Sequence, residues 1–221
     1  MTEETGLSWV AAQCDDLEDL PVEELDCLAE RGPVEAMLRI AERSVTALSR
    51  PRAVRLGQDV RHLLESSLLD AAIRTVWLGA TDQVFDPAKD GISARVWLRQ
   101  MEQSWLAAER RSDRLFVPPP AAPETNEGLR RDVLRAIGQV SSDLTDTVEN
   151  RSYPLPLPGL APALEQVTVH ACADLGYRLF LRALKASYVA IDTETQDTLV
   201  ALGNRFGYPQ SLVAEGLNHR R

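Results

Sequence analysis

Apolar residues recur along most of this chain with helical spacing. One stripe, at steps of three or four residues, runs from Val34 to Leu48 behind Pro33, a residue suited to the first turn of a helix. Similar stripes run from about Arg52 to Gly79, Ile92 to Phe116, Leu129 to Val148 and Ala163 to Ile191, followed by shorter helical segments at about 193–206 and 209–218. No segment alternates with period two for long enough to predict a strand. The pattern predicts an all-α fold, either a multi-helix bundle or an irregular helical array, with no substantial β-sheet.

Two proline-rich segments interrupt this helical pattern. Val117-Pro-Pro-Pro-Ala-Ala-Pro123 is typical of a stiff polyproline II connector, and residues 153–159 form a second extended passage. The first segment divides the chain into an acidic N-terminal segment plus helical body (1–116), a connector (117–123) and a C-terminal helical part (124–221). We expect the two helical parts to pack together as one globule.

The net charge of −9 argues against a generally basic nucleic-acid-binding surface. It is unevenly distributed, because residues 1–30 contain ten acidic residues and no Lys or Arg, which leaves 23 acids against 24 bases in the rest. The favoured interpretation is an acidic helix face that is solvated and maintains solubility. The alternative is a docking segment for a basic partner.

Several features predict a cytoplasmic bacterial protein. The start Met-Thr-Glu-Glu lacks the basic region of a signal peptide, and no apolar run approaches the length of a membrane span. Cys14, Cys27 and Cys172 form no C-x-x-C pair, so we expect them to be reduced and packed as small apolar side chains. Arginine supplies 22 of the 24 basic residues, a bias associated with GC-rich bacterial coding sequences.

Asp15-Asp16-Leu17-Glu18-Asp19 spells D-D-x-x-D. On a helix, Asp15 and Asp19 would lie one turn apart, where their carboxylates can share a cation such as Mg²⁺. The pattern resembles the aspartate-rich motif of all-α isoprenoid synthases, which implies a metal-dependent enzyme acting on a diphosphate. The similarity covers five residues and no second metal-binding motif follows, so a solvated acidic helix is the favoured interpretation.

Other catalytic patterns are missing from the sequence. The three histidines are His62, His170 and His219. We interpret His62 with Glu65 as a surface pair, and His170 as a buried histidine at the start of the last apolar stripe. No G-x-S-x-G, Walker A or dinucleotide-binding glycine pattern occurs. The sequence therefore predicts no catalytic residue, cofactor or metal ligand, and it favours a non-enzymatic protein.

The C-terminal segment 196–219 resembles a helix-turn-helix in the spacing of Gly203, Phe206, Gly207, Val213 and Leu217. A glycine at the turn is suitable because this backbone adopts a left-handed conformation. The resemblance implies a DNA-binding transcriptional regulator. Its recognition helix would begin at Tyr208, Gln210 and Ser211, and Arg205 and Arg220 would contact phosphates. The favoured interpretation is a terminal helical hairpin packed on the body.

The helix predicted at 92–116 is the leading candidate for a contact surface. It carries Arg95, Arg99, Arg110, Arg111 and Arg114, and Trp97 lies off its main apolar stripe. Arginine and tryptophan are enriched among residues that dominate binding energy at protein interfaces. The favoured interpretation of the helix itself is a core helix whose arginines extend along its sides. The leading hypothesis is therefore a protein–protein interaction, with another protein or a second copy, by an accessory subunit of a bacterial cytosolic complex.

Overall fold

The computed structural model describes residues 4–15, 20–121 and 126–220. Over these ranges the chain forms eleven α-helices, which confirms the all-α prediction. They are α1 (Gly6–Ala12), α2 (Val22–Arg31), α3 (Pro33–Ala47), α4 (Arg50–Glu65), α5 (Asp70–Ala80), α6 (Ala94–Ser112), α7 (Glu127–Glu149), α8 (Leu160–His170), α9 (Ala173–Ala186), α10 (Thr193–Phe206) and α11 (Gln210–Ala214). A 3₁₀ turn, η2 (Pro87–Asp90), precedes α6, and β1 (Ala190–Ile191) pairs in parallel with β2 (Asn218–His219).

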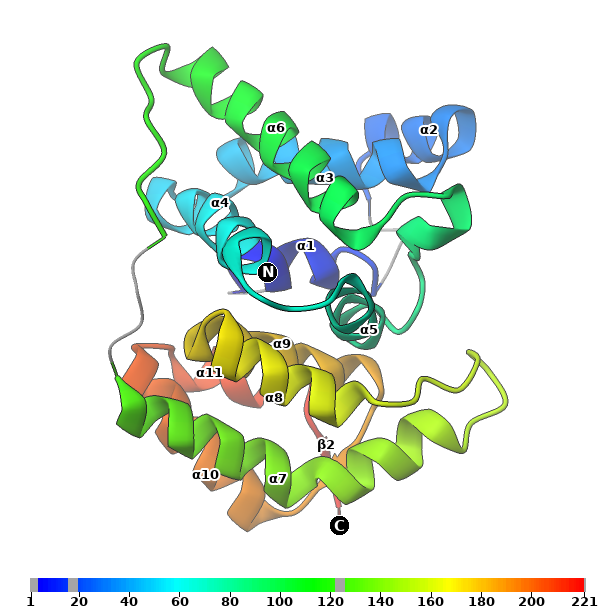
Figure 1. Ribbon diagram of the computed structural model, residues 1–221, viewed down its shortest axis with the longest axis vertical. Coiled ribbons are helices and arrows are strands. Elements are labelled where there is room, and N and C mark those ends of the chain that lie inside the picture. Colours follow the sequence, from blue (N-terminus) through cyan, green and yellow to red (C-terminus); the bar gives the residue numbers. More distant parts are fainter. Residues whose placement is uncertain (1–3, 16–19, 122–125, 221) are drawn as a thin grey trace.

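The helices form two layers that share one hydrophobic core. Helices α1 to α6 make one layer and α7 to α11 the other, with α1 and α5 facing α8 and α9 across the middle (Figure 1). After α6 the described chain runs along the outside of the layer that contains α6, and residues 117–121 of the predicted connector have no regular structure (Figure 1). The buried apolar side chains of both layers belong to one continuous cluster.

Helix α1 lies at the centre of the molecule, where all seven of its residues are buried. It packs against α4 on one side and α9 on the other. Glu4, just before the helix, is also buried, whereas Glu23, Asp26 and Glu30 of α2 are exposed. The interpretation of residues 1–30 as a solvated acidic segment is therefore wrong for residues 4–12. The segment's average charge concealed the short apolar run that begins at Leu7.

Two of the predicted long helices are each divided in two. The stripe from Arg52 to Gly79 ends as α4 at Glu65 and resumes as α5 at Asp70. The Arg95 guanidinium of α6 stabilises the break by donating hydrogen bonds to four carbonyl oxygens, those of Leu63, Leu64, Ser66 and Leu68. A distant residue therefore supplies donors to carbonyls that a helix end leaves unpaired.

The stripe from Ala163 to Ile191 is likewise divided, into α8 and α9. Helix α8 ends at His170, and α9 then packs against it at Gly176. A Cβ added to Gly176 would lie 2.2 Å from Thr168 Oγ1, so glycine permits this close approach. His170 is exposed at the end of α8, and the prediction of a buried histidine is therefore wrong.

The three cysteines lie inside the protein. Cys14, Cys27 and Cys172 are buried, which confirms their packing as small apolar side chains. Among the helices of the described ranges, none combines the length and apolar character needed to cross a membrane.

Candidate functional site

Helix α6 packs through two faces, which decides which of its residues are accessible. Its main buried stripe, Ala94, Leu98, Met101, Trp105 and Ala108, follows the sequence prediction and packs against α3 and α4. Trp97 lies beside that stripe but is only 1% exposed. Its ring centroid is 4.5 Å from that of Trp77 and 5.5 Å from that of Phe85. Because α5 and the segment before η2 cover this second face, Trp97 belongs to the core and is not accessible to a partner.

The arginines predicted on α6 fall into two groups. The Arg95 guanidinium is occupied by the carbonyl oxygens at the end of α4 and just after it. Its Nε also lies 3.1 Å from Asp70 Oδ1. Arg99 is exposed in the first half of the helix. Arg110 and Arg111 are exposed in the last turn of α6, and Arg114 is exposed just beyond it. The structure therefore concentrates the exposed predicted residues at the C-terminal end of the helix.

Two exposed aliphatic side chains accompany these arginines. Leu115 is 89% exposed and Val117 is 80% exposed, whereas Phe116 between them is buried. The Phe116 ring packs edge-on against Trp105, with 5.8 Å between centroids. Helix α6 ends at Ser112 and Phe116 turns inward, so the neighbours of Phe116 point outward. Leu115 therefore does not continue the apolar stripe predicted from Ile92 to Phe116. We call Arg110, Arg111, Arg114, Leu115 and Val117 the α6 tip.

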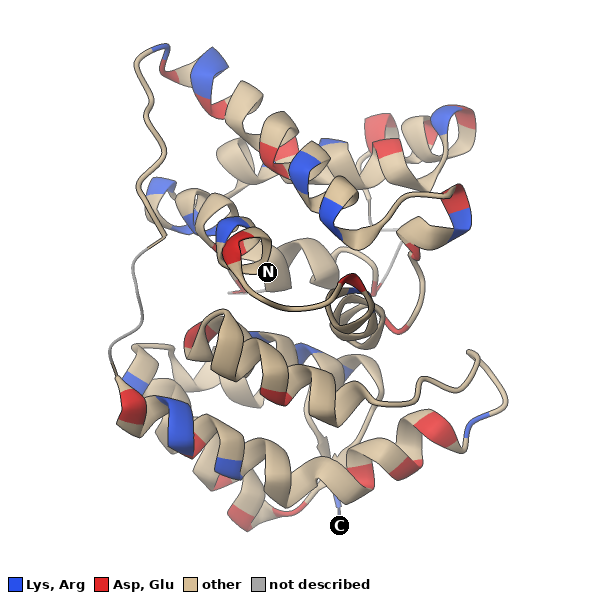
Figure 2. Ribbon diagram, in the orientation of Figure 1, with Lys and Arg blue, Asp and Glu red and all other residues tan. Residues whose placement is uncertain are grey.

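The charge near the α6 tip is mainly positive. Basic positions occur at the end of α6 and at the beginning of α4 (Figure 2). Arg50 Nη2 lies 2.8 Å from Asp113 Oδ2, and this hydrogen bond holds the pKa of Asp113 below its usual range. Arg111 Nη2 lies 2.7 Å from Glu42 Oε2. Among the described residues, Arg110 and Arg114 have no carboxylate within ion-pair distance, so their charges remain free for an external acid.

A groove of about 350 Å³ lies beside the tip, between α2, α3 and α6. Arg43 lines this groove; its Nη2 donates to Gln13 Oε1 at 2.8 Å, and its guanidinium lies 5.2 Å from the Trp9 ring centroid. The groove is lined by three acids and three bases: Glu23, Glu24, Glu42, Arg39, Arg43 and Arg111. It is therefore balanced in charge, unlike the tip.

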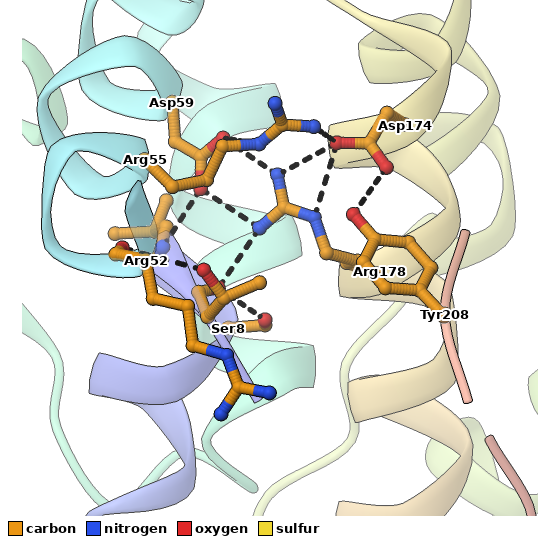
Figure 3. Close-up of polar contacts among 9 residues, drawn as sticks. Ser8, Arg52, Arg55, Asp59, Asp174, Arg178 and Tyr208 are labelled. Carbon is orange, nitrogen blue, oxygen red and sulfur yellow. Dashed lines mark hydrogen bonds and ion pairs between the residues drawn. The ribbon is translucent and has the colours of Figure 1, made fainter. Parts of the chain in front are cut away.

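The segment resembling a helix-turn-helix forms a hairpin packed on the body. Gly207 has the expected left-handed conformation, with φ of 81°, between α10 and α11. Helix α11 contains only five residues and is about 7.5 Å long. The Tyr208 hydroxyl donates to the Asp174 carboxylate (Figure 3). The Tyr208 ring stacks on that of Tyr177, with 6.3 Å between centroids. Both the hydroxyl and the ring of Tyr208 are therefore engaged by residues of α9.

The other residues assigned to DNA contact are partly engaged as well. Arg205 pairs with Asp132 on α7, and Arg220 Nη2 lies 2.9 Å from Asp143 Oδ2. Gln210 and Ser211 are exposed at the start of α11. The two arginines therefore bridge the hairpin to α7, and the described residues form no free basic surface around α11.

The D-D-x-x-D motif is only partly described. Asp15 follows α1 in a bend, and its carboxylate accepts hydrogen bonds from both terminal nitrogens of Arg182 on α9. Asp16 to Asp19 lie outside the described residues. Within the described ranges, no group of three His, Cys, Asp or Glu side chains is arranged to hold a metal ion.

A buried polar network joins the two layers of the molecule (Figure 3). Arg178 of α9 donates to Asp59 of α4 and to Asp174 of α9, while Arg55 of α4 also donates to Asp174. The hydroxyl of Tyr208 completes the set of donors around Asp174. Every charged group in this network has an opposite partner, so its arrangement serves to hold the layers together.

Sequence reasoning missed this network, although α9 contains a signal for it. Asp174, Arg178, Arg182 and Lys185 recur at steps of four, four and three within an otherwise largely apolar helix. Such spacing places charged side chains on one face of a helix. Because the sides of α9 are buried, these charges require partners from other segments.

Comparisons with known proteins supply no assignment for any of these features: no family model matches the chain, and neither a curated protein nor a solved structure is significantly similar to it.

Proposed function

We propose that this chain is a non-enzymatic protein that binds another protein through the α6 tip. The observation that supports the proposal is the exposure of Leu115 and Val117 just after the end of α6, which carries Arg110, and just after Arg114; both arginines lack acidic partners among the described residues. A single exposed aliphatic residue is ordinary on a protein surface. Two of them combined with free arginines provide both an apolar contact and charge complementarity.

The chemistry of the tip defines the partner that it suits. Arginine binds carboxylates with paired hydrogen bonds, so acidic side chains complement the basic part of the tip. Leu115 and Val117 suit an aliphatic or aromatic side chain of the partner. The proposed partner is therefore a protein segment with one apolar anchor flanked by Asp or Glu. An accessory role in a bacterial cytoplasmic complex is part of this proposal and is supported only by the composition of the chain.

A selection of random peptides displayed on phage tests the proposal, because it works with a partner of any identity. Purified protein should enrich peptides that contain Leu, Phe or Trp flanked by acids. We expect Arg114→Glu and Leu115→Ser each to weaken binding of a selected peptide at least tenfold in fluorescence anisotropy. That factor corresponds to about 1.4 kcal/mol of binding free energy.

Arg99→Glu provides a matched control, because Arg99 is an exposed arginine on the same helix but lies away from the tip. Its binding should equal that of the unmodified chain. Thermal unfolding of all three variants checks that the fold is retained, which we expect because the substituted side chains are exposed. Equal binding by the Arg114 and Leu115 variants, or enrichment of basic peptides, would contradict the proposal.

A further inference from the structure

Lys185 is one of the two lysines in the sequence, and it lines a second cavity, of about 460 Å³. Four segments form this cavity: the start of the described chain with the bend after α1, the turn after α5, the end of α9 and the end of α11. The Lys185 side chain is 10% exposed. Its Nζ donates to the Leu212 carbonyl at 2.6 Å and lies 3.8 Å from Glu4 Oε1. Because Leu212 and Glu4 both line the cavity, the amine lies at its wall.

The surroundings of Lys185 favour its neutral form. Burial withdraws water from the ammonium ion, and the guanidinium of Arg182, one turn earlier on the same face of α9, repels it. The carboxylates of Glu4, Asp15 and Glu215 act in the opposite direction. Even so, the pKa of Lys185 lies below its ordinary value of 10.5. Since an amine is a nucleophile only without its extra proton, these surroundings make Lys185 more reactive at neutral pH.

Glu4, the acid nearest to this amine, is shifted in the opposite sense. Burial raises the pKa of its carboxyl group above the ordinary value of 4.5, and the charges of Arg182 and Lys185 only partly offset this. The separation of 3.8 Å between Glu4 Oε1 and Lys185 Nζ exceeds an ordinary hydrogen bond, so the two groups do not form a tight ion pair. A neutral amine beside a carboxyl group that retains its proton combines a nucleophile with a proton donor, as imine formation requires.

Most charges at the wall of the cavity are compensated within the chain. Asp15 accepts hydrogen bonds from Arg182, and Asp82 pairs with Arg151. Val84, which also lines the cavity, is 48% exposed and offers an apolar contact. The volume lies within the range of small-molecule sites. An uncharged molecule with a short apolar chain therefore suits this cavity better than an ion.

We infer that Lys185 binds a small aldehyde or ketone covalently, as an imine formed at this cavity. The neutral Nζ attacks the carbonyl carbon, a C–N bond forms, and the carbonyl oxygen takes up a proton that the nitrogen loses. Glu4 then protonates the resulting hydroxyl group, which leaves as water, and takes back the remaining N–H proton as the C=N bond forms. One amine and one carbonyl compound thus give one imine and one water, with no oxidant or reductant. The site is independent of the α6 tip and of the protein partner proposed for it.

Propanal with an excess of sodium cyanoborohydride tests the inference on the full chain, because the reagent reduces the imine to a stable propylamine. Mass spectrometry of peptides then locates and quantifies the modification at each lysine separately. Lys89, which is exposed in η2, is a matched control within the same chain. At pH 7, Lys185 should be propylated at least about fivefold faster than Lys89, because more of its amine is neutral. A rate at Lys185 equal to or below that at Lys89 would overturn the inference.

The same labelling in guanidinium chloride separates the effect of the fold from that of the local sequence. In the unfolded chain the two lysines should react at equal rates, and a preference for Lys185 that persisted there would overturn the inference.

Glu4→Gln tests the proton donor at a cyanoborohydride concentration high enough that imine formation limits the rate. It should slow propylation of Lys185 at least about threefold, because the amide cannot supply the proton. Loss of the negative charge alone would act in the opposite direction, by favouring the neutral amine. Glu30→Gln, at an exposed position of α2, is the control and should leave the rate unchanged. An unchanged or faster rate in folded Glu4→Gln would overturn the role assigned to Glu4, and the comparison of Lys185 with Lys89 needs no variant at all.

Discussion

Arg178 of α9 donates two hydrogen bonds to Asp59 of α4, at 2.6 and 2.8 Å, and the side chains are 2% and 1% exposed. Arg178 also donates to the Thr5 carbonyl at 3.0 Å, and Asp59 accepts from the Leu7 backbone N–H at 2.8 Å. The pair therefore joins the N-terminal segment, α4 and α9. Because the pair is inaccessible to water, removing either partner leaves the other buried charge without its nearest opposite charge.

Arg178→Met should destabilise the protein by about 3–5 kcal/mol, the usual effect of breaking a buried ion pair. Methionine retains much of the apolar length of arginine but supplies no donor to Asp59. Urea unfolding followed by circular dichroism measures the change in the free energy of unfolding. The double variant Asp59→Leu with Arg178→Met should recover part of the loss, because it removes both charges.

Arg220→Met is the control for this experiment. Arg220 and Asp143 form an ion pair whose side chains are 54% and 44% exposed. Solvent screens such a pair, and its loss should change stability by about 1 kcal/mol or less. If Arg178→Met had an effect as small as that of Arg220→Met, the importance assigned to the buried pair would be wrong.

Gly6→Ala should be strongly destabilising because of both conformation and space. Gly6 has a φ of 63°, and an added Cβ would lie 2.0 Å from Asp59 Oδ2. Gly91→Ala is a matched control, since Gly91 has a φ of 72° but no atom within 4 Å of an added Cβ. The control should lose about 1–2 kcal/mol through backbone strain alone. Urea unfolding should show a clearly larger loss for Gly6→Ala, and equal losses would contradict the steric explanation.

The helices that the apolar stripes predicted most accurately are those whose ends are determined locally. Pro33 begins α3, Asn126 caps α7 through Leu129 N–H, and Gly207 ends α10. The missed ends depend on contacts between helices. The break after Glu65 is stabilised by Arg95, and α9 approaches α8 through Gly176. Neither contact can be inferred from the local spacing of apolar residues.

The candidate site could be predicted only in part, for a similar reason. The arginine pattern identified Arg110, Arg111 and Arg114, which are exposed. It could not show that Trp97 is covered, because that depends on α5 packing against a second face of α6. The sequence pattern also could not show that Leu115 is exposed. Leu115 falls at a position where the apolar spacing of the helix predicts burial, but the helix ends before it, at Ser112.

Removing residues 1–15 should abolish cooperative folding, even though the first 30 residues are so acidic. The deletion removes Leu7, Trp9, Val10 and Ala11 from the core and takes away the Thr5 and Leu7 backbone partners of the buried ion pair. Loss of several buried apolar side chains exceeds the usual net stability of a domain. Differential scanning calorimetry should show no cooperative transition for the shortened chain.

A variant that neutralises exposed acidic residues of α2 tests whether the N-terminal segment stabilises the fold through its negative charge or through its buried apolar side chains. Asp26→Asn with Glu30→Gln changes two exposed residues of α2 and should alter the unfolding free energy by about 0.5 kcal/mol or less. If this double variant unfolded as readily as the shortened chain, acidity rather than burial would explain the need for the N-terminal segment.

The contribution of Asp174 to stability should disappear in acid. Burial alone raises the pKa of Asp174, but Arg178, Arg55 and the Tyr208 hydroxyl together hold it below the ordinary value of 3.8. A carboxyl group with a lower pKa in the folded state stabilises the fold above its unfolded pKa of about 3.9, and this stabilisation is lost as the pH falls through the folded value. Asp174→Asn should therefore be less stable than the unmodified chain by about 2 kcal/mol at pH 7.

Urea unfolding at pH 7, 5, 4 and 3 measures this dependence. The difference between the two proteins should be constant from pH 7 to pH 5 and should shrink below about pH 4, because protonated Asp174 then resembles asparagine in charge. Asp143→Asn, in the exposed pair with Arg220, serves as the comparison and should show a small difference at every pH. A difference for Asp174→Asn that stayed constant down to pH 3 would mean that its carboxylate charge does not stabilise the network, and that the amide merely disturbs the packing.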